Sequence, residues 1–323
     1  MFDSVSVTAS ARLHLGFLDM NGGLGRLFGS LGLAIDRPRT RLTVRRAARL
    51  TAEGPDEERA SRYLDDFARK LGLTPAYSVT VHEAIPPHAG LGSGTQLALA
   101  LATALRQLEG RPRDDLNDAL VLSRGTRSGI GLGLFQQGGF VVDGGRGPRS
   151  AAPPVVARME FPPEWRVIIV LDPHKQGVHG SAEQAAFAAL ADFSAGSAAE
   201  ICRLVLIKAL PALAEQDIDT FGAAIARLQE IIGAYFSPAQ GGAPFASLAV
   251  ARIVEELRRH GARGTGQSSW GPTGFAFAAS AREARRLYDL SRENAAALGL
   301  DMLVCKGVNH GALVDGETFA TVK

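Results

Sequence analysis

The sequence predicts an α+β protein of two domains, and three observations support this prediction. Val5–Leu15 (VSVTASARLHL) alternates polar and apolar residues, as a half-buried strand does. Asp56–Leu71 repeats its apolar residues at helical spacing instead. Residues 143–154 (DGGRGPRSAAPP) are rich in glycine and proline, and we interpret them as a connection between domains. We therefore expect an N-terminal domain over residues 1–160 and a C-terminal domain over residues 161–323.

The N-terminal half continues with further strands and a second helix. A glycine-rich turn at 21–32 leads to a strand-like segment around Thr40–Val44. Tyr77–His82 alternates again and predicts a half-buried strand. A stripe of leucines at helical spacing then predicts a helix through Leu97, Leu101, Leu105 and Leu108.

The C-terminal half begins with Val167–Leu171, an unbroken apolar run that predicts a buried strand. Helical patterns follow at about 181–191, 198–213, 218–232 and 246–260. A strand at 275–280, a helix at 281–298 and a strand at 302–306 complete this half.

The composition excludes several classes of function. Of the 323 residues, 46% are hydrophobic and 21% are charged, and the net charge is +2, as in a soluble globular protein without nucleic acid or membrane as an obligatory partner. The N-terminus lacks the basic start and apolar core of a signal peptide, and the longest apolar helical run, 97–105, is shorter than the ~20 residues that span a bilayer. We expect a cytoplasmic protein. The two cysteines, Cys202 and Cys305, lie far apart and predict buried thiols.

The segment 85-IPPHAGLGSGTQLALALATAL-105 places three glycines, Gly90, Gly92 and Gly94, directly before an apolar helix. Glycines let backbone N–H groups turn toward an anion, and the helix dipole adds positive potential there. A phosphate site is one interpretation, and a structural turn is the other. No Gly-Lys-Ser/Thr follows, and the glycine spacing is not that of a dinucleotide fingerprint, so neither of these sites is predicted.

Three segments resemble the motifs of the GHMP kinase superfamily. The second motif of that superfamily, a proline followed by Gly-Leu-Gly-Ser-Ser-Ala, is matched by Pro87, Gly90, Leu91, Gly92 and Ser93, while Gly94 and Thr95 replace its Ser and Ala. The first motif is similar to 9-ASARLHLGFLD-19, for which an ordinary edge strand is the alternative, and the third to 264-GTGQSSWGPTGFAF-277. The resemblance implies a two-domain GHMP-kinase-like fold, with a ribosomal-S5-domain-2-like N-terminal domain and a ferredoxin-like C-terminal domain.

A fourth segment, 128-SGIGLGLFQQGGFVVDGG-145, distinguishes between chemistries. Mevalonate kinases of this superfamily carry Ser-Gly-Ile-Asp, whose Asp is the catalytic carboxylate, and Gly131 stands at that position here. Homoserine kinases manage without this carboxylate. An ATP-dependent small-molecule kinase therefore stays an alternative.

The four segments together closely resemble the β-ribofuranosylaminobenzene 5′-phosphate synthase family, over nearly the whole chain. The resemblance implies a pentosyltransferase that joins phosphoribosyl pyrophosphate to 4-aminobenzoate or 4-hydroxybenzoate, releases CO2 and pyrophosphate, and serves tetrahydromethanopterin biosynthesis. It also implies Mg²⁺ as the counter-ion of the pyrophosphate. A non-catalytic sugar-phosphate sensor is the second alternative, and a homodimer is compatible with a sequence that does not fix the assembly state.

The matching segments supply the candidate site residues. The catalytic candidates are Arg12, His14 and Arg26. The phosphate-binding candidates are Pro87, Gly90, Leu91, Gly92, Ser93, Gly94, Thr95, Gln96 and Arg127, and the substrate-binding candidates are Gln267, Ser268, Ser269, Trp270 and Gly271. The candidate metal ligands are Asp19, Glu183 and Ser93. Each has a structural alternative: a solvated arginine or carboxylate, a structural histidine, or a core tryptophan.

Overall fold

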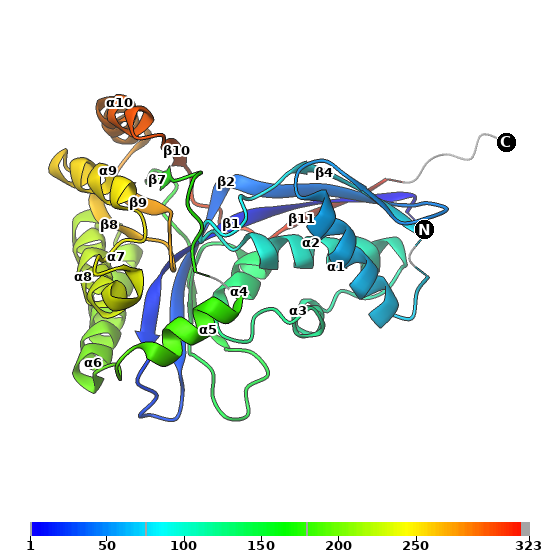
Figure 1. Ribbon diagram of the computed structural model, residues 1–323, viewed down its shortest axis with the longest axis horizontal. Coiled ribbons are helices and arrows are strands. Elements are labelled where there is room, and N and C mark those ends of the chain that lie inside the picture. Colours follow the sequence, from blue (N-terminus) through cyan, green and yellow to red (C-terminus); the bar gives the residue numbers. More distant parts are fainter. Residues whose placement is uncertain (1, 75, 179, 318–323) are drawn as a thin grey trace.

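Two sheets with their covering helices build the molecule, and the computed structural model describes residues 2–74, 76–178 and 180–317 (Figure 1). The strands of the first sheet are β1 (Ser4–Asp19), β2 (Phe28–Arg46), β3 (Thr51–Glu53), β4 (Tyr77–Glu83), β5 (Phe140–Asp143), β6 (Val155–Met159) and β11 (Leu313–Glu317). Its helices are α1 (Glu57–Lys70), α2 (Ser93–Leu108), α3 (Asp115–Val121) and α4 (Ile130–Gln137). The second sheet holds β7 (Arg166–Leu171), β8 (Arg263–Gln267), β9 (Gly274–Ala278) and β10 (Asp301–Cys305). Its helices are α5 (Gly180–Ala189), α6 (Ala195–Leu204), α7 (Leu210–Ala214), α8 (Ile218–Phe236), α9 (Leu248–Arg259) and α10 (Ala281–Ala297).

The long strands β1 and β2 pair antiparallel and form the spine of the first sheet. The strand order is β11-β1-β2-β4-β3, and β5 pairs with the first part of β2. Helices α1 to α4 lie on one side of this sheet (Figure 1). The alternation predicted for β1 is confirmed, because Val5, Val7 and Ala9 are buried in one cluster with α1 and α2.

The second sheet has the ferredoxin-like strand order that the family resemblance implies. Its antiparallel strands lie in the order β10-β7-β9-β8, which is 4-1-3-2 by position in the chain. Val167 and Ile169 of β7 pack into the cluster that contains α8, whereas Ile168 and Val170 pack against α9 and α10. Because β7 is covered on both faces, its sequence is apolar throughout.

The two halves share one hydrophobic core. A single buried cluster contains Leu13 and Phe17 of β1, Phe236 of α8 and Trp270 of the third motif. The final strand β11 also returns to the first sheet and pairs with β1. The boundary near residue 160 therefore stays a prediction.

Two details of the sequence interpretation are wrong. Residues 144–154 do not connect domains but join β5 to β6, which pair with each other in the first sheet. Glycine and proline serve there to turn the chain between two neighbouring strands. Cys305 is buried as predicted, but Cys202 is exposed on α6. In the described part of the chain, no helix has the length and apolar character needed to cross a membrane.

Glu83 at the end of β4 makes the stability of the fold depend on pH. Its carboxylate accepts hydrogen bonds from Arg39 and Arg41 of β2 at 2.8–2.9 Å, and these contacts, those of Arg39 foremost, lower its pKa from 4.5 to about 2. We expect Glu83→Gln to lower Tm at pH 7 only slightly, because exposed ion pairs contribute ~0.2–1 kcal/mol each. Since the folded-state pKa is depressed, this stabilisation is present above pH 4.5 and is lost as the pH falls toward 2. Melting curves of both proteins should converge at the acidic end; a Tm gap that stays constant would rule out the ion pairs as its cause.

Candidate active site

A cleft of about 440 Å³ brings together most of the predicted site residues. Its walls come from both halves of the chain: β1, the loop before α2, residues 123–128, the segment before α5, and residues 269–271. The predicted residues that line it are Arg12, His14, Gly90, Gly92, Ser93, Gly94, Thr95, Arg127, Ser269, Trp270 and Gly271.

The start of α2 forms one end of the cleft. Gly92 is the N-cap residue, in the left-handed conformation with φ 76°, and the helix has no side-chain cap. The N–H groups of Thr95 and Gln96 donate to the carbonyl of Gly92, whereas those of Ser93 and Gly94 donate to no described residue. An uncapped helix start of this kind is suited to binding an anion.

Two arginines flank this helix start. On the Gly92 side, the side chain of Arg12 lies 3.1 Å from the point where a Cβ of Gly92 would be. On the Gly94 side, Nη1 of Arg124 lies 3.2 Å from the corresponding point of Gly94. The guanidinium of Arg124 donates a hydrogen bond to the hydroxyl of Tyr63 on α1 and lies over its ring, 5.1 Å from the centroid.

The cleft is strongly electropositive. Among its described lining residues are three arginines and two histidines, namely Arg12, Arg124, Arg127, His14 and His88, and no aspartate or glutamate. The Arg127 guanidinium lies 5.1 Å from the ring centroid of Phe187 on α5. This charge distribution fits an anionic ligand.

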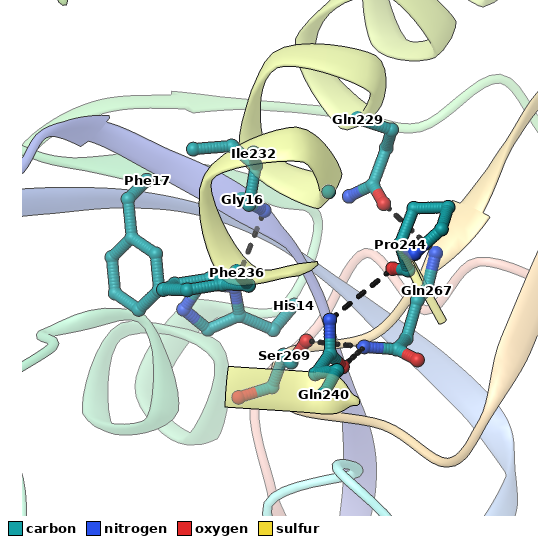
Figure 2. A pocket seen from close by; sticks show the side chains of 11 residues that line it. His14, Gly16, Phe17, Gln229, Ile232, Phe236, Gln240, Pro244, Gln267 and Ser269 are labelled. Atoms are coloured by element: carbon teal, nitrogen blue, oxygen red, sulfur yellow. Dashed lines mark hydrogen bonds between the residues drawn. The ribbon is translucent and has the colours of Figure 1, made fainter. Parts of the chain in front are cut away.

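His14 also lines the cleft and is buried beside an aromatic ring. Its ring centroid lies 4.6 Å from that of Phe17, and its Nδ1 accepts a hydrogen bond from the N–H of Gly16 at 3.2 Å (Figure 2). Burial, together with the positive charge of Arg12, lowers the pKa of His14 well below 6.5. The ring is therefore neutral at pH 7, and the bond from Gly16 assigns its single proton to Nε2. His14 thus presents a hydrogen-bond donor rather than a base.

A cavity of only about 10 Å³ lies behind His14 and Ser269 (Figure 2). Gln267, a predicted substrate-binding residue, lines this small cavity. Its side-chain NH2 donates to Gln240, and its side-chain oxygen accepts from the N–H of Ala246. It does not line the cleft.

Trp270 is a core aromatic as well as a cleft residue. It is 2% exposed, and its ring centroid lies 4.2 Å from that of Phe236 and 5.0 Å from that of Phe187. Phe17 and Phe187 also contact each other at 6.2 Å. The aromatic lining residues of the cleft, Phe17 and Trp270, are therefore parts of one packed aromatic cluster.

Ser268 ties the three motifs together instead of facing the cleft. Its hydroxyl accepts a hydrogen bond from the N–H of His14 at 2.9 Å and donates one to the carbonyl of Gly90 at 2.7 Å. Gly90 must be a glycine because a Cβ there would lie 2.5 Å from the carbonyl oxygen of Ser268. The glycine loop is thus held against β1.

Five other candidates lie outside the cleft lining. Arg26 binds the carbonyls of Gly144 and Gly145, and the carboxylate of Asp19 caps the turn at residues 21–22. Leu91 is buried, and Gln96 is buried with its amide on the carbonyl of Gly131. Pro87 is exposed beside the loop. Ligand roles for these residues stay predictions.

The described residues do not form a protein cage for Mg²⁺. No group of three or more His, Cys, Asp or Glu side chains with metal-binding proximity occurs among them. Of the three candidate ligands, only the hydroxyl of Ser93 lines the cleft, and the side chain of Glu183 lies outside the described part of the chain. Mg²⁺ prefers carboxylate, water and phosphate oxygens, so a protein site of its own is not supported here.

Sequence reasoning identified only Arg127 in the loop between α3 and α4 and missed the other cleft residues of this loop. The loop contributes Ser123, Arg124, Thr126 and Ser128 to the cleft, and His88 was also missed. The signal was present, because two arginines three residues apart directly precede the Ser-Gly-Ile-Gly segment. No sequence pattern indicates that Tyr63 contacts Arg124.

Family models for the N-terminal and C-terminal domains of GHMP kinases match residues 58–136 and 209–294. β-Ribofuranosylphenol 5′-phosphate synthase of Methanothermobacter thermautotrophicus is 31% identical over 288 residues, which cover 82% of this chain and 86% of that protein. The protein of the same name from Archaeoglobus fulgidus is 34% identical over 235 residues, covering 68% and 74%.

Two solved structures show the same fold at low sequence identity. Homoserine kinase from Cytophaga hutchinsonii has a TM-score of 0.68 at 18% identity, with 98% of each chain covered. Mevalonate diphosphate decarboxylase from Staphylococcus aureus has a TM-score of 0.66 at 16% identity, again covering 98% of each chain. These likenesses and the two family models confirm the predicted GHMP-kinase-like fold.

Gly92 offers a direct test of the phosphate end of the cleft. A side chain there adopts the left-handed conformation only with strain, typically ~1–3 kcal/mol, and crowds Arg12 as well. We expect Gly92→Val to weaken the binding of phosphoribosyl pyrophosphate about tenfold to a hundredfold, with Ser93→Ala weakening it less. Benzoate binding should stay near wild type. The protein should still fold, with a Tm lowered by several degrees, because the folded state carries the strain whether or not a ligand is bound. Calorimetric titration with each ligand separately measures this, and normal donor binding by Gly92→Val would make the loop a structural turn.

Proposed function

Because this chain belongs to the β-ribofuranosylphenol 5′-phosphate synthase family of GHMP-type proteins, we propose that it is a pentosyltransferase acting on phosphoribosyl pyrophosphate. The acceptor is a para-substituted benzoate, and CO2 and pyrophosphate are released. The product is a β C-riboside on the path to tetrahydromethanopterin. The observation that carries this proposal is the lining of the cleft, which combines three arginines and an uncapped helix start with the aromatic side chains of Phe17 and Trp270.

The start of α2, flanked by Arg12 and Arg124, supports binding of the donor's pyrophosphate. Arg12 and the free N–H groups of Ser93 and Gly94 converge there, and guanidinium and helix-start N–H groups are the usual protein ligands of phosphate. The same groups stabilise the negative charge that develops on the pyrophosphate as it departs. Mg²⁺ would arrive bound to the pyrophosphate and would neutralise part of its charge, and Ser93 is the candidate ligand whose residue lines the cleft.

The aromatic lining residues of the cleft support binding of the acceptor ring. Phe17 and Trp270 provide flat apolar surface, and His14 provides one hydrogen-bond donor. Arg12 and His14 are two residues apart on β1, so their side chains leave the same face of the strand, ~7 Å apart along it. A ribosyl donor at Arg12 and a benzoate at His14 would therefore meet between these side chains.

The chemistry needs no protein base or nucleophile. The ring carbon that bears the carboxylate attacks the anomeric carbon, the bond to pyrophosphate breaks, and the configuration is inverted. The electron pair of the carbon–carboxylate bond then returns to the ring as CO2 leaves. No net proton is gained or lost, which agrees with a cleft whose described lining contains neutral His14 and no carboxylate.

Phosphoryl transfer from ATP is the alternative that the fold leaves open. The observation against it is Gly131, which is buried in α4, where a Cβ would lie 3.2 Å from the methyl of Thr95. No carboxylate faces the cleft from this position, which carries the Asp of mevalonate-type kinases. A non-catalytic sugar-phosphate sensor would bind its ligand in the same cleft without converting it to a product.

The decisive experiment incubates the protein with phosphoribosyl pyrophosphate, Mg²⁺ and each benzoate. We expect CO2 and pyrophosphate in equal amounts, and only when both substrates are present. Pyrophosphate without CO2 would indicate donor hydrolysis and would contradict the proposal. A parallel incubation with ATP and small alcohols should give no phosphoryl transfer.

His14 supplies a prediction about the acceptor. Because Nε2–H donates and does not accept, it pairs better with a hydroxyl oxygen than with an aromatic amine, and we expect a higher kcat/KM with 4-hydroxybenzoate than with 4-aminobenzoate. His14→Phe keeps an aromatic ring but removes the donor. It should lower kcat/KM for the hydroxybenzoate about tenfold, the effect of losing one buried hydrogen bond, and should abolish the preference. Donor affinity serves as the internal control, and an unchanged preference in the variant would exclude His14 from the acceptor site.

A further inference from the structure

We infer that Arg124, held in place by Tyr63, binds the outer phosphoryl group of the donor's diphosphate and so distinguishes a diphosphate from a monophosphate. This inference rests on the proposed function for the identity of the diphosphate. Neither residue belongs to a segment that the sequence motifs mark as part of the site. Arg124 lies beside the start of α2, contacts Tyr63 and has no carboxylate partner among the described residues.

Arg124 and Arg12 lie on different sides of the start of α2. Arg12 contacts the Gly92 side, and Arg124 contacts the Gly94 side, each within about 3.2 Å of a hypothetical Cβ. The N–H groups of Ser93 and Gly94, which donate to no described residue, belong to the same helix start. Arg12 and these N–H groups suffice to bind a single phosphate at the helix start. A diphosphate is longer and reaches the second guanidinium as well.

The anchor of Arg124 is neutral, which distinguishes it from Arg59 and Arg106. Arg59 is paired with the carboxylate of Asp56, and Arg106 binds Asp118 through three hydrogen bonds of 2.6–2.9 Å. Arg124 instead donates to the phenol of Tyr63 and lies over its ring. A phenol and a ring face orient a guanidinium without cancelling its charge.

The guanidinium of Arg124 also retains unused donor capacity. Its Nη2 donates to Tyr63, whereas Nη1, which lies beside Gly94, donates to no described residue, and no described carboxylate pairs with the group. The group lines the cleft. An oriented cation with free donors beside a helix start is a preorganised anion site, which gains affinity because little ordering is left to do on binding.

The test uses inorganic pyrophosphate and orthophosphate as probes, titrated calorimetrically into the full-length protein. Wild type should bind pyrophosphate more tightly than orthophosphate. Tyr63→Phe keeps the ring and removes only the hydroxyl, so we expect a threefold to tenfold weaker affinity for pyrophosphate, about the effect of one hydrogen bond, and an orthophosphate affinity within about twofold of wild type. Arg124→Gln should weaken pyrophosphate binding further, about tenfold to a hundredfold.

Matched controls separate positioning from general damage. Tyr288→Phe removes the hydroxyl of another tyrosine under an arginine, Arg285 at 5.5 Å, on α10 away from the cleft, and should leave both affinities unchanged. In an Arg124→Gln background, Tyr63→Phe should have no further effect, because a positioning residue acts only through its partner. If Tyr63→Phe fails to fold, Gly94→Ala serves instead, since its added methyl would press on Nη1 of Arg124.

Two results would overturn the inference: equal losses of pyrophosphate and orthophosphate affinity in Tyr63→Phe, or wild-type pyrophosphate affinity in Arg124→Gln. A wild-type protein that discriminates pyrophosphate through Tyr63 and Arg124 but releases no CO2 with either benzoate would support the diphosphate site. That result would count against the proposed ribosyl transfer alone.

Discussion

The attachment of the glycine loop to β1 and to the third motif is the constraint on which the site depends. The hydroxyl of Ser268 bridges His14 and Gly90, and the N–H of Arg12 donates to the carbonyl of Leu91 at 3.0 Å. The hydroxyl of Thr273 donates to the carbonyl of Ala89 at 2.6 Å. Backbone groups that would otherwise need solvent are thereby satisfied within the protein. The start of α2 is fixed in position without a capping side chain, and its N–H groups stay available to a ligand.

Sequence patterns predicted the parts of the fold whose residues repeat regularly. The alternation of β1 and β4, the leucine stripe of α2 and the apolar run of β7 all correspond to observed elements. The elements without a strong repeat were missed. Strand β8 has the sequence RGTGQ, whose two glycines give no strand signal, and β5 holds only four residues. Their pairing partners, not their own propensities, make them strands.

The site was predictable to the extent that motifs carry it. The segments around Arg12, Gly92 and Trp270 were identified from sequence and do meet in one cleft. Motif membership did not separate residues that face the cleft from residues that hold it together, as Ser268 and Gln96 show. That distinction depends on side-chain direction and on contacts between residues such as Tyr63 and Arg124, 61 positions apart in the chain. No local pattern encodes such a contact.

The return of β11 to the first sheet has a consequence for how the chain folds during synthesis. Ser4 of β1 pairs with Glu317 of β11, so one edge of the first strand finds its neighbour only after residue 317 has been made. Until then the ribosome-bound chain carries a strand edge with unpaired N–H and C=O groups. Such distant pairings slow folding and prolong exposure to aggregation. A chaperone would therefore protect the chain most while the N-terminal half has been synthesised and β11 has not.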